Sequence, residues 1–144
     1  MPLNLYGDDW DREEAGFRVT AVAERLGAEL VAANLYEVAP GETTWPYHFH
    51  HAEEELLIVL SGRLTVRTPA GARQLERGDV LLFPRGPEGA HEERNPGPEP
   101  ARFLLVSTRP PLEVTEEPDS GRVNVYSRHG TLRLQRLRSQ HRGP

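Results

Sequence analysis

Short apolar runs separated by turn residues dominate the middle of the chain. Such runs occur at residues 30–38, 55–60, 64–68, 72–75, 80–83 and 101–107. Residues 55–60 (ELLIVL) are continuously apolar after Glu55, which favours a strand that is buried on both faces. Leu64 and Val66 alternate with polar neighbours and share one face of another strand. Many short strands at a spacing of roughly 8–12 residues predict an all-β sandwich or barrel.

The two ends of the chain carry weaker patterns. Residues 1–16 are polar and acidic, and we expect an N-terminal arm that docks through Trp10 and Phe17. We expect the barrel to span residues 17–111 and a C-terminal extension to span residues 112–144, with a basic tail from about residue 128. Within these regions three patterns are ambiguous: a helical spacing at Val22, Leu26 and Leu30, an edge strand at Val123, Val125 and Tyr126, and a short helix or frayed strand at Leu132, Leu134 and Leu137.

Composition agrees with a single small domain rich in turns. The chain has 144 residues, 13 Gly, 13 Pro and no Cys. The absence of Cys excludes disulfides, thiolate-ligated metals and thiol nucleophiles, so imidazoles and carboxylates must hold any metal ion. All 17 basic residues are Arg, which also excludes Schiff-base chemistry by lysine.

Charge is unevenly distributed along the chain. Residues 120–144 hold six Arg and no acidic residue, so the rest of the chain carries −11 if the whole chain carries −5. This pattern lacks interleaved aromatic residues, and it favours a solvated tail, or one docked on the acidic body, over a nucleic-acid partner. No apolar run approaches the roughly 18–20 residues of a membrane span, and the N-terminus is not a signal peptide. We therefore expect no membrane partner and a cytoplasmic location.

Histidines supply the candidate chemistry. His48 and His50 project to one side if residues 47–50 form a strand, and His51 projects to the other side. Two imidazoles on an inward face form a platform for a metal ion, and Glu55 and His91 adjoin the two buried strands. Three imidazoles and one carboxylate suit Mn, Fe, Ni, Co or Zn. A lone His-x-His pair, however, is more often a polar filler than a ligand pair.

Two sequence motifs support a metal site more strongly than the His-x-His pair does alone. Residues 41–62 place Gly41, His48-x-His50, Glu55 and Gly62 in the order and spacing of the first cupin motif. Residues 78–95 (GDVLLFPRGPEGAHEERN) are similar to the second cupin motif, and its histidine corresponds to His91. One extra residue after Gly41 and two after Gly86 fall in loops. The chain thus resembles the cupin superfamily, and most closely the compact single-domain bacterial cupins, with which it shares PYHFHHAEEE, FPRGPEGAH and PDSG.

The resemblance implies a cupin double-stranded β-helix, that is, a jelly-roll barrel with a divalent transition metal ion inside. It implies that His48, His50, Glu55 and His91 are the metal ligands. Glu54 is the alternative to Glu55, and we expect His51 to lie behind the ligands or on the surface. Compact cupins usually form homodimers through sheet edges and exchanged arms, which we expect here too.

The resemblance does not identify a reaction. We expect a metal-binding cupin that acts on a small organic molecule, as a dioxygenase-like oxidoreductase or an isomerase. The alternatives are a non-catalytic small-ligand-binding or sensor cupin, and a barrel with a vestigial site. We expect Arg63 or Arg85 either to pair with an anionic substrate or to be solvated. Residues that face either a pocket or the ordinary core are Tyr36, Tyr47, Phe49, Leu57, Arg67, Phe83 and Phe103.

Overall fold

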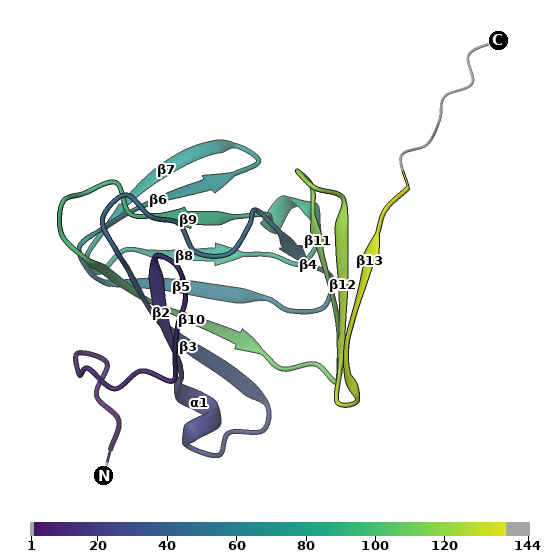
Figure 1. The fold of residues 1–144 in the computed structure, drawn as a ribbon, viewed down its shortest axis with the longest axis horizontal. Coiled ribbons are helices and arrows are strands. Elements are labelled where there is room, and N and C mark those ends of the chain that lie inside the picture. Colours follow the sequence, from purple (N-terminus) through teal and green to yellow (C-terminus); the bar gives the residue numbers. More distant parts are fainter. Residues whose placement is uncertain (1, 138–144) are drawn as a thin grey trace.

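The computed structural model describes residues 2–137 and is built almost entirely from antiparallel strands (Figure 1). The elements in chain order are β1 (Arg12–Glu13), β2 (Phe17–Ala21), α1 (Val22–Arg25), β3 (Val31–Val38), β4 (Phe49–His50), β5 (Glu55–Ser61), β6 (Arg63–Thr68), β7 (Gly71–Glu76), β8 (Val80–Phe83), the 3₁₀ turn η1 (Pro87–Gly89), β9 (Glu92–Arg94), β10 (Ala101–Thr108), β11 (Leu112–Glu117), β12 (Arg122–Ser127) and β13 (Gly130–Gln135). No helix among the described residues is long and apolar enough to cross a bilayer.

Two of the three sheets enclose the main core. The larger sheet has the strand order β1-β2-β3-β10-β5-β8, and the smaller one has the order β7-β6-β9. Their inner faces pack together through a cluster of buried side chains that includes Leu57, Val59, Leu64, Val66 and Phe103. Alternate residues of each strand enter this core, which is the pattern that Leu64 and Val66 predicted. The predicted all-β jelly-roll fold is confirmed.

Two glycines of the motifs serve the backbone geometry. Gly62, between β5 and β6, has a φ of 73°, and a Cβ there would lie 2.7 Å from the Pro100 carbonyl oxygen. Gly89 has a closer approach, because a Cβ would lie 1.8 Å from the Pro84 carbonyl oxygen. Side chains are therefore excluded at both positions. At Gly89 this keeps η1 tight against the strand end that precedes His91.

A third sheet, with the order β13-β12-β11-β4, stands beside one end of the barrel (Figure 1). We call strands β11 (Leu112–Glu117), β12 (Arg122–Ser127) and β13 (Gly130–Gln135) of this sheet the C-terminal hairpin sheet. Val123, Val125 and Tyr126 do lie on a strand, β12, but its predicted edge position is wrong, because β12 pairs with both β11 and β13. Leu132 and Leu134 belong to β13, a strand and not a helix. Of the predicted basic tail, residues 138–144 lie outside the described residues.

Three contacts fasten the C-terminal hairpin sheet to the barrel. The Arg67 guanidinium on β6 donates to both carboxylate oxygens of Asp119, at 2.6 and 3.0 Å. His51 Nε2 lies 2.6 Å from a Glu116 carboxylate oxygen. The Glu113 Oε1 atom accepts backbone N–H bonds from His51 and Ala52, at 2.9 and 3.1 Å. The hairpin sheet is therefore held in register with the histidine segment that precedes β5.

The N-terminal arm lies on the outer face of the larger sheet. Trp10 is placed beside the guanidiniums of Arg18 and Arg102, at 4.9 and 5.0 Å from the ring centroid. Phe17 begins β2 and makes an edge contact with Trp45 at 4.9 Å between centroids. The arm thus docks on its own barrel, as Trp10 and Phe17 predicted, and β1 inside it pairs with β2. The helical spacing near residue 22 produces only the single turn α1, whereas residues 31–38 form β3.

Candidate metal centre

His48, His50 and His91 meet where the β4 segment crosses the chain after η1. His48 and His91 exchange backbone hydrogen bonds of 3.2 and 3.0 Å as an isolated bridge, and β4 begins one residue later. The His48 and His50 rings lie on the same side, with centroids 5.0 Å apart. The His51 side chain is 47% exposed and turns to Glu116, as the i, i+2 argument predicted.

Glu55 completes a group of four with these three imidazoles. It is the first residue of β5, and the potential ligand atoms of the four residues all lie within 4.8 Å of one another. The Glu55 Oε1 atom is 2.9 Å from His50 Nε2 and 3.4 Å from His91 Nε2. Glu54, the alternative to Glu55, is exposed and is not part of the group. The structure therefore brings together His48, His50, Glu55 and His91.

His48 and His91 each have a hydrogen-bond partner at Nδ1, whereas His50 Nδ1 has only an ion-pair contact and no hydrogen bond among the described residues. His48 Nδ1 lies 2.7 Å from the Pro46 carbonyl oxygen, and His91 Nδ1 lies 2.8 Å from that of Gly89. His50 Nδ1 lies 3.2 Å from a carboxylate oxygen of Glu53. A neutral imidazole that donates from Nδ1 carries its lone pair on Nε2, the state that binds a cation.

Unpaired buried atoms show that this group is suited to a cation. His50 Nε2, Glu55 Oε1 and His91 Nε2 are buried and have no hydrogen-bond partner among the described residues, and the same holds for Glu93 Oε1. An unsatisfied buried polar atom costs about 1–3 kcal/mol, so several at one point need a compensating partner. Nitrogen and oxygen donors in this combination fit a divalent transition metal ion.

Burial and mutual contacts set the protonation of the group. Burial lowers the pKa of His91 and His48, and the neighbouring imidazoles lower that of His48 further. Burial alone raises the pKa of Glu55, but the contacts with His50 outweigh it and leave that pKa below its ordinary value. Burial alone lowers the pKa of His50, but its contact with Glu55 and the charges of Glu55 and Glu53 outweigh this and raise it. The site therefore favours neutral His48 and His91 and an ionised Glu55, and His50 would release a proton when a metal ion binds.

Sequence reasoning missed two further carboxyl groups, Glu93 and Glu53. Glu93 Oε1 lies 3.5 Å from His91 Nε2, and the Thr44 hydroxyl donates to the other oxygen at 2.7 Å. Burial raises the pKa of Glu93, and also that of Glu53, to about 7. The i, i+2 rule that paired His48 with His50 also connects His91 to Glu93 and offered a signal for it.

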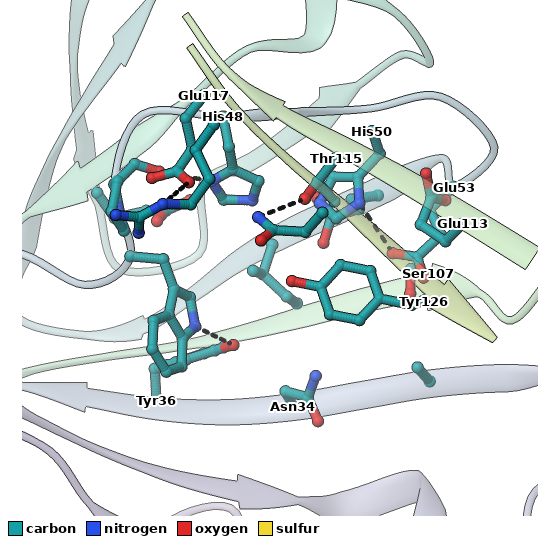
Figure 2. Close-up of a pocket in the computed structure, with 18 of the residues that line it drawn as sticks. Asn34, Tyr36, His48, His50, Glu53, Ser107, Glu113, Thr115, Glu117 and Tyr126 are labelled. Carbon is teal, nitrogen blue, oxygen red and sulfur yellow. Dashed lines mark hydrogen bonds and ion pairs between the residues drawn. The ribbon is translucent and has the colours of Figure 1, made fainter. Parts of the chain in front are cut away.

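A cavity of about 630 Å³ opens from this group toward the C-terminal hairpin sheet. Figure 2 shows His48 and His50 on one side of it, with Asn34 and Tyr36 of β3 across from them. Its other polar and charged lining residues are Arg12, Glu53, Glu55, Glu93, Ser107, Glu113, Thr115, Glu117, Arg122, Asn124, Tyr126 and Arg133. The cavity thus joins the candidate metal centre to a polar outer chamber.

Of the aromatic, aliphatic and Arg residues that the sequence offered for a pocket, Tyr36 alone lines this cavity. Phe83 stacks on the His91 ring at 3.7 Å between centroids and supports its position from behind. Arg63 and Arg85 are exposed and lie outside the cavity lining. The others fill the cores or, for Arg67, cover the Tyr47 ring: Tyr47, Phe49, Leu57 and Phe103 are buried.

Comparison with known proteins defines the class to which this fold and site belong. Residues 34–107 match the family model of the cupin domain, and the chain belongs to the cupin family. Among solved structures it is similar to a sugar phosphate isomerase of the cupin superfamily from Silicibacter pomeroyi, with 25% identity and a TM-score of 0.80 over 90% of this chain and 85% of that one. No curated protein matches the chain.

Two further structures extend the comparison. A proposed sugar phosphate isomerase from Acidithiobacillus ferrooxidans is 24% identical, with a TM-score of 0.75 over 85% of this chain and 81% of that one. The polyketide cyclase RemF from Streptomyces resistomycificus is 25% identical, with a TM-score of 0.57 over 65% of each chain. The first two similarities cover most of this chain, so they extend well beyond residues 34–107.

Proposed function

We propose that this cupin is a metal-dependent isomerase of a small, sugar-like molecule, with His48, His50, Glu55 and His91 as the ligands of one divalent Mn, Fe, Co, Ni or Zn ion. The observation that carries the proposal is the convergence of unpaired, buried nitrogen and oxygen atoms at the inner end of a polar cavity. The similarity to a sugar phosphate isomerase over 90% of this chain supports the choice of reaction.

The ion, when bound, would polarise a carbonyl or hydroxyl oxygen of the substrate. The chain supplies the groups that orient the rest of the molecule. Asn34, Ser107, Thr115 and Tyr126 place amide and hydroxyl groups along the cavity, and these can pair with substrate hydroxyls. A lining rich in such groups fits a polyhydroxylated substrate better than an apolar one, which favours an isomerase over a dioxygenase of apolar compounds.

Isomerisation of an aldose to a ketose moves one proton from C2 to C1 and another from the C2 hydroxyl to the C1 oxygen, and it needs no oxidant or reductant. A carboxylate beside the substrate must accept the carbon-bound proton from C2 and return it to C1. Glu53 has the required access, because its side chain lines the cavity and is 22% exposed. Glu93 also borders the cavity, but its side chain is only 2% exposed. We assign the proton transfer to Glu53.

Metal analysis of untagged protein tests the ligand assignment. We expect about one transition metal ion per chain, and loss of that ion when His48 and His50 are both replaced by Ala. A His51→Ala variant is the matched control and keeps the ion. Less than about a tenth of an ion per chain in the wild type would overturn the metal site, as would full metal content in the double variant.

Turnover of a panel of aldoses, ketoses and their phosphates by the metal-loaded protein tests the reaction. We expect interconversion of one aldose–ketose pair, with loss of activity in the double His variant. Binding without turnover of any member would instead favour a non-catalytic ligand-binding cupin and contradict the isomerase. A homodimeric state and a cytoplasmic location stay predictions, and sedimentation analysis checks the first.

A further inference from the structure

Three arginines line the outer part of the cavity: Arg12 on β1, Arg122 on β12 and Arg133 on β13. All three lie outside residues 34–107, the segment that matches the family model. They therefore come from the N-terminal arm and the C-terminal hairpin sheet, which this chain adds to the cupin barrel.

The strand register places two of these arginines on one face. Arg133 pairs directly with Asn124 across the β12–β13 ladder, and Arg122 precedes Asn124 by two residues. Arg122 and Arg133 are thus diagonal neighbours, and the backbones of two such residues are about 7–8 Å apart. Long guanidinium side chains at that separation can reach one ligand together. Figure 2 shows the neighbouring β12 residue Tyr126 turned into the same cavity.

The three arginines differ in how far neighbouring carboxylates neutralise their charge. Arg133 forms no ion pair within residues 2–137. The Arg122 Nε atom is 3.7 Å from a Glu117 oxygen, which is longer than a hydrogen bond. Arg12 pairs with Glu14 and lies over the Trp45 ring, 5.4 Å from its centroid. The outer chamber therefore offers guanidinium donors to an anion.

We propose that Arg122 and Arg133, with Arg12 on the facing wall, bind the phosphate group of a phosphorylated sugar. The inference rests on the proposed function and adds the substrate class. A phosphate dianion has three terminal oxygens and accepts hydrogen bonds from more than one guanidinium, whereas a carboxylate is satisfied by a single bidentate arginine.

Binding of unreactive analogues tests this proposal apart from turnover. Sorbitol 6-phosphate, sorbitol and gluconate lack the aldose–ketose carbonyl, and their dissociation constants for the protein as purified can be measured by calorimetry. We expect sorbitol 6-phosphate to bind at least about tenfold more tightly than either other probe, since a charge-assisted hydrogen bond contributes roughly 1.5–3 kcal/mol. Arg122→Gln and Arg133→Gln should each reduce that preference by about tenfold. Arg63→Gln, an exposed arginine outside the cavity, should retain it.

The outcomes separate this inference from the proposed function. Equal binding of sorbitol and sorbitol 6-phosphate overturns the phosphate site, as does equal loss in Arg133→Gln and Arg63→Gln. Gluconate binding as tight as that of sorbitol 6-phosphate overturns the phosphate in favour of a sugar acid. Selective, arginine-dependent binding of sorbitol 6-phosphate without isomerisation of any sugar phosphate supports the site and overturns the isomerase. Unchanged melting temperatures confirm that the variants are folded.

Discussion

Three carboxyl groups surround the imidazoles, and their surroundings give them different roles. Glu55 contacts both His50 and His91 and is held ionised, which suits a ligand. Glu93 is almost fully buried, accepts a hydrogen bond from Thr44 and has a pKa of about 7 because of burial. Glu53 faces the cavity and has a similar pKa for the same reason. Only Glu53 combines access to the substrate with a position outside the ligand group.

Glu53→Gln should therefore separate catalysis from metal binding. We expect kcat to fall by about 10²–10⁴-fold, because the amide cannot accept a proton, while the metal content stays near that of the wild type. Steady-state kinetics and elemental analysis measure the two quantities. Glu54→Gln, at an exposed neighbour, is the control and should match the wild type. Loss of the metal in Glu53→Gln would assign Glu53 to holding His50 instead.

At this residue scale the sequence named the four residues that the structure brings together, but little of the rest of the cavity. His48, His50, Glu55 and His91 could be named because strand alternation and motif spacing act over short distances. The inward positions of Arg122 and Arg133 depend on the pairing of β12 with its two neighbours. That pairing is set by long-range register, which the residues between 112 and 135 do not reveal locally.

Among the elements, the N-terminal arm depends on one buried ion network. Glu37 on β3 accepts hydrogen bonds from Arg18 and Arg102, and Arg102 also donates to the backbone oxygens of Leu5 and Gly7. Burial alone raises the pKa of Glu37, but the two guanidiniums outweigh it and hold that pKa below its ordinary value. The ionised carboxylate thus ties the arm and β2 to β10.

Glu37→Gln should destabilise the protein in a pH-dependent way. At pH 7 we expect a loss of about 1–3 kcal/mol in the free energy of unfolding, since two partly buried guanidiniums lose a charged hydrogen-bond partner. A carboxyl with a lowered folded-state pKa stabilises the fold above its unfolded value of 4.5, and this contribution is lost as pH falls through the folded-state pKa. Urea titrations from pH 7 to pH 3 measure it. A difference between wild type and variant that persists undiminished at pH 3 would contradict the charge-based account.

The C-terminal hairpin sheet depends on fewer contacts, and Glu116 is the central one. Its carboxylate pairs with the His51 imidazole and the Arg136 guanidinium, and its side chain is 12% exposed. Glu116→Gln should loosen this sheet and raise KM several-fold more than it changes kcat, because the outer cavity wall is displaced while the metal group stays in place. Amide exchange in β11–β13 should quicken by about tenfold for each 1.4 kcal/mol lost. Glu76→Gln, on the exposed side of β7, serves as the control, and equal exchange in both variants would contradict the anchoring role.

At the scale of the whole molecule, the candidate metal ligands and the cavity arginines come from different parts of the chain. The segment that matches the family model, residues 34–107, contains all four residues of the metal group. The added arm and C-terminal hairpin sheet supply the arginines and much of the polar wall of the cavity. Glycine and proline turns between short apolar strands predicted an all-β sandwich or barrel, and the resemblance to cupins implied the jelly-roll. The sequence did not predict that the C-terminal hairpin sheet lines the cavity, because the contacts that place this sheet join residues far apart in the chain, such as Arg67 and Asp119 or His51 and Glu116.

Removal of the metal should therefore lower the free energy of unfolding of the whole molecule. A ligand that binds only the folded state stabilises it by about 2.7 kcal/mol at a free concentration of 100 times its dissociation constant. For a chain of this size that corresponds to a rise in Tm of roughly 5–10 °C. Protein stripped with a chelator should lose this increment and regain it when the native metal is returned, as followed by calorimetry. The His48→Ala, His50→Ala variant should show no metal-dependent rise, whereas His51→Ala should respond like the wild type. An equal response in the double variant would place the stabilising ion elsewhere in the molecule.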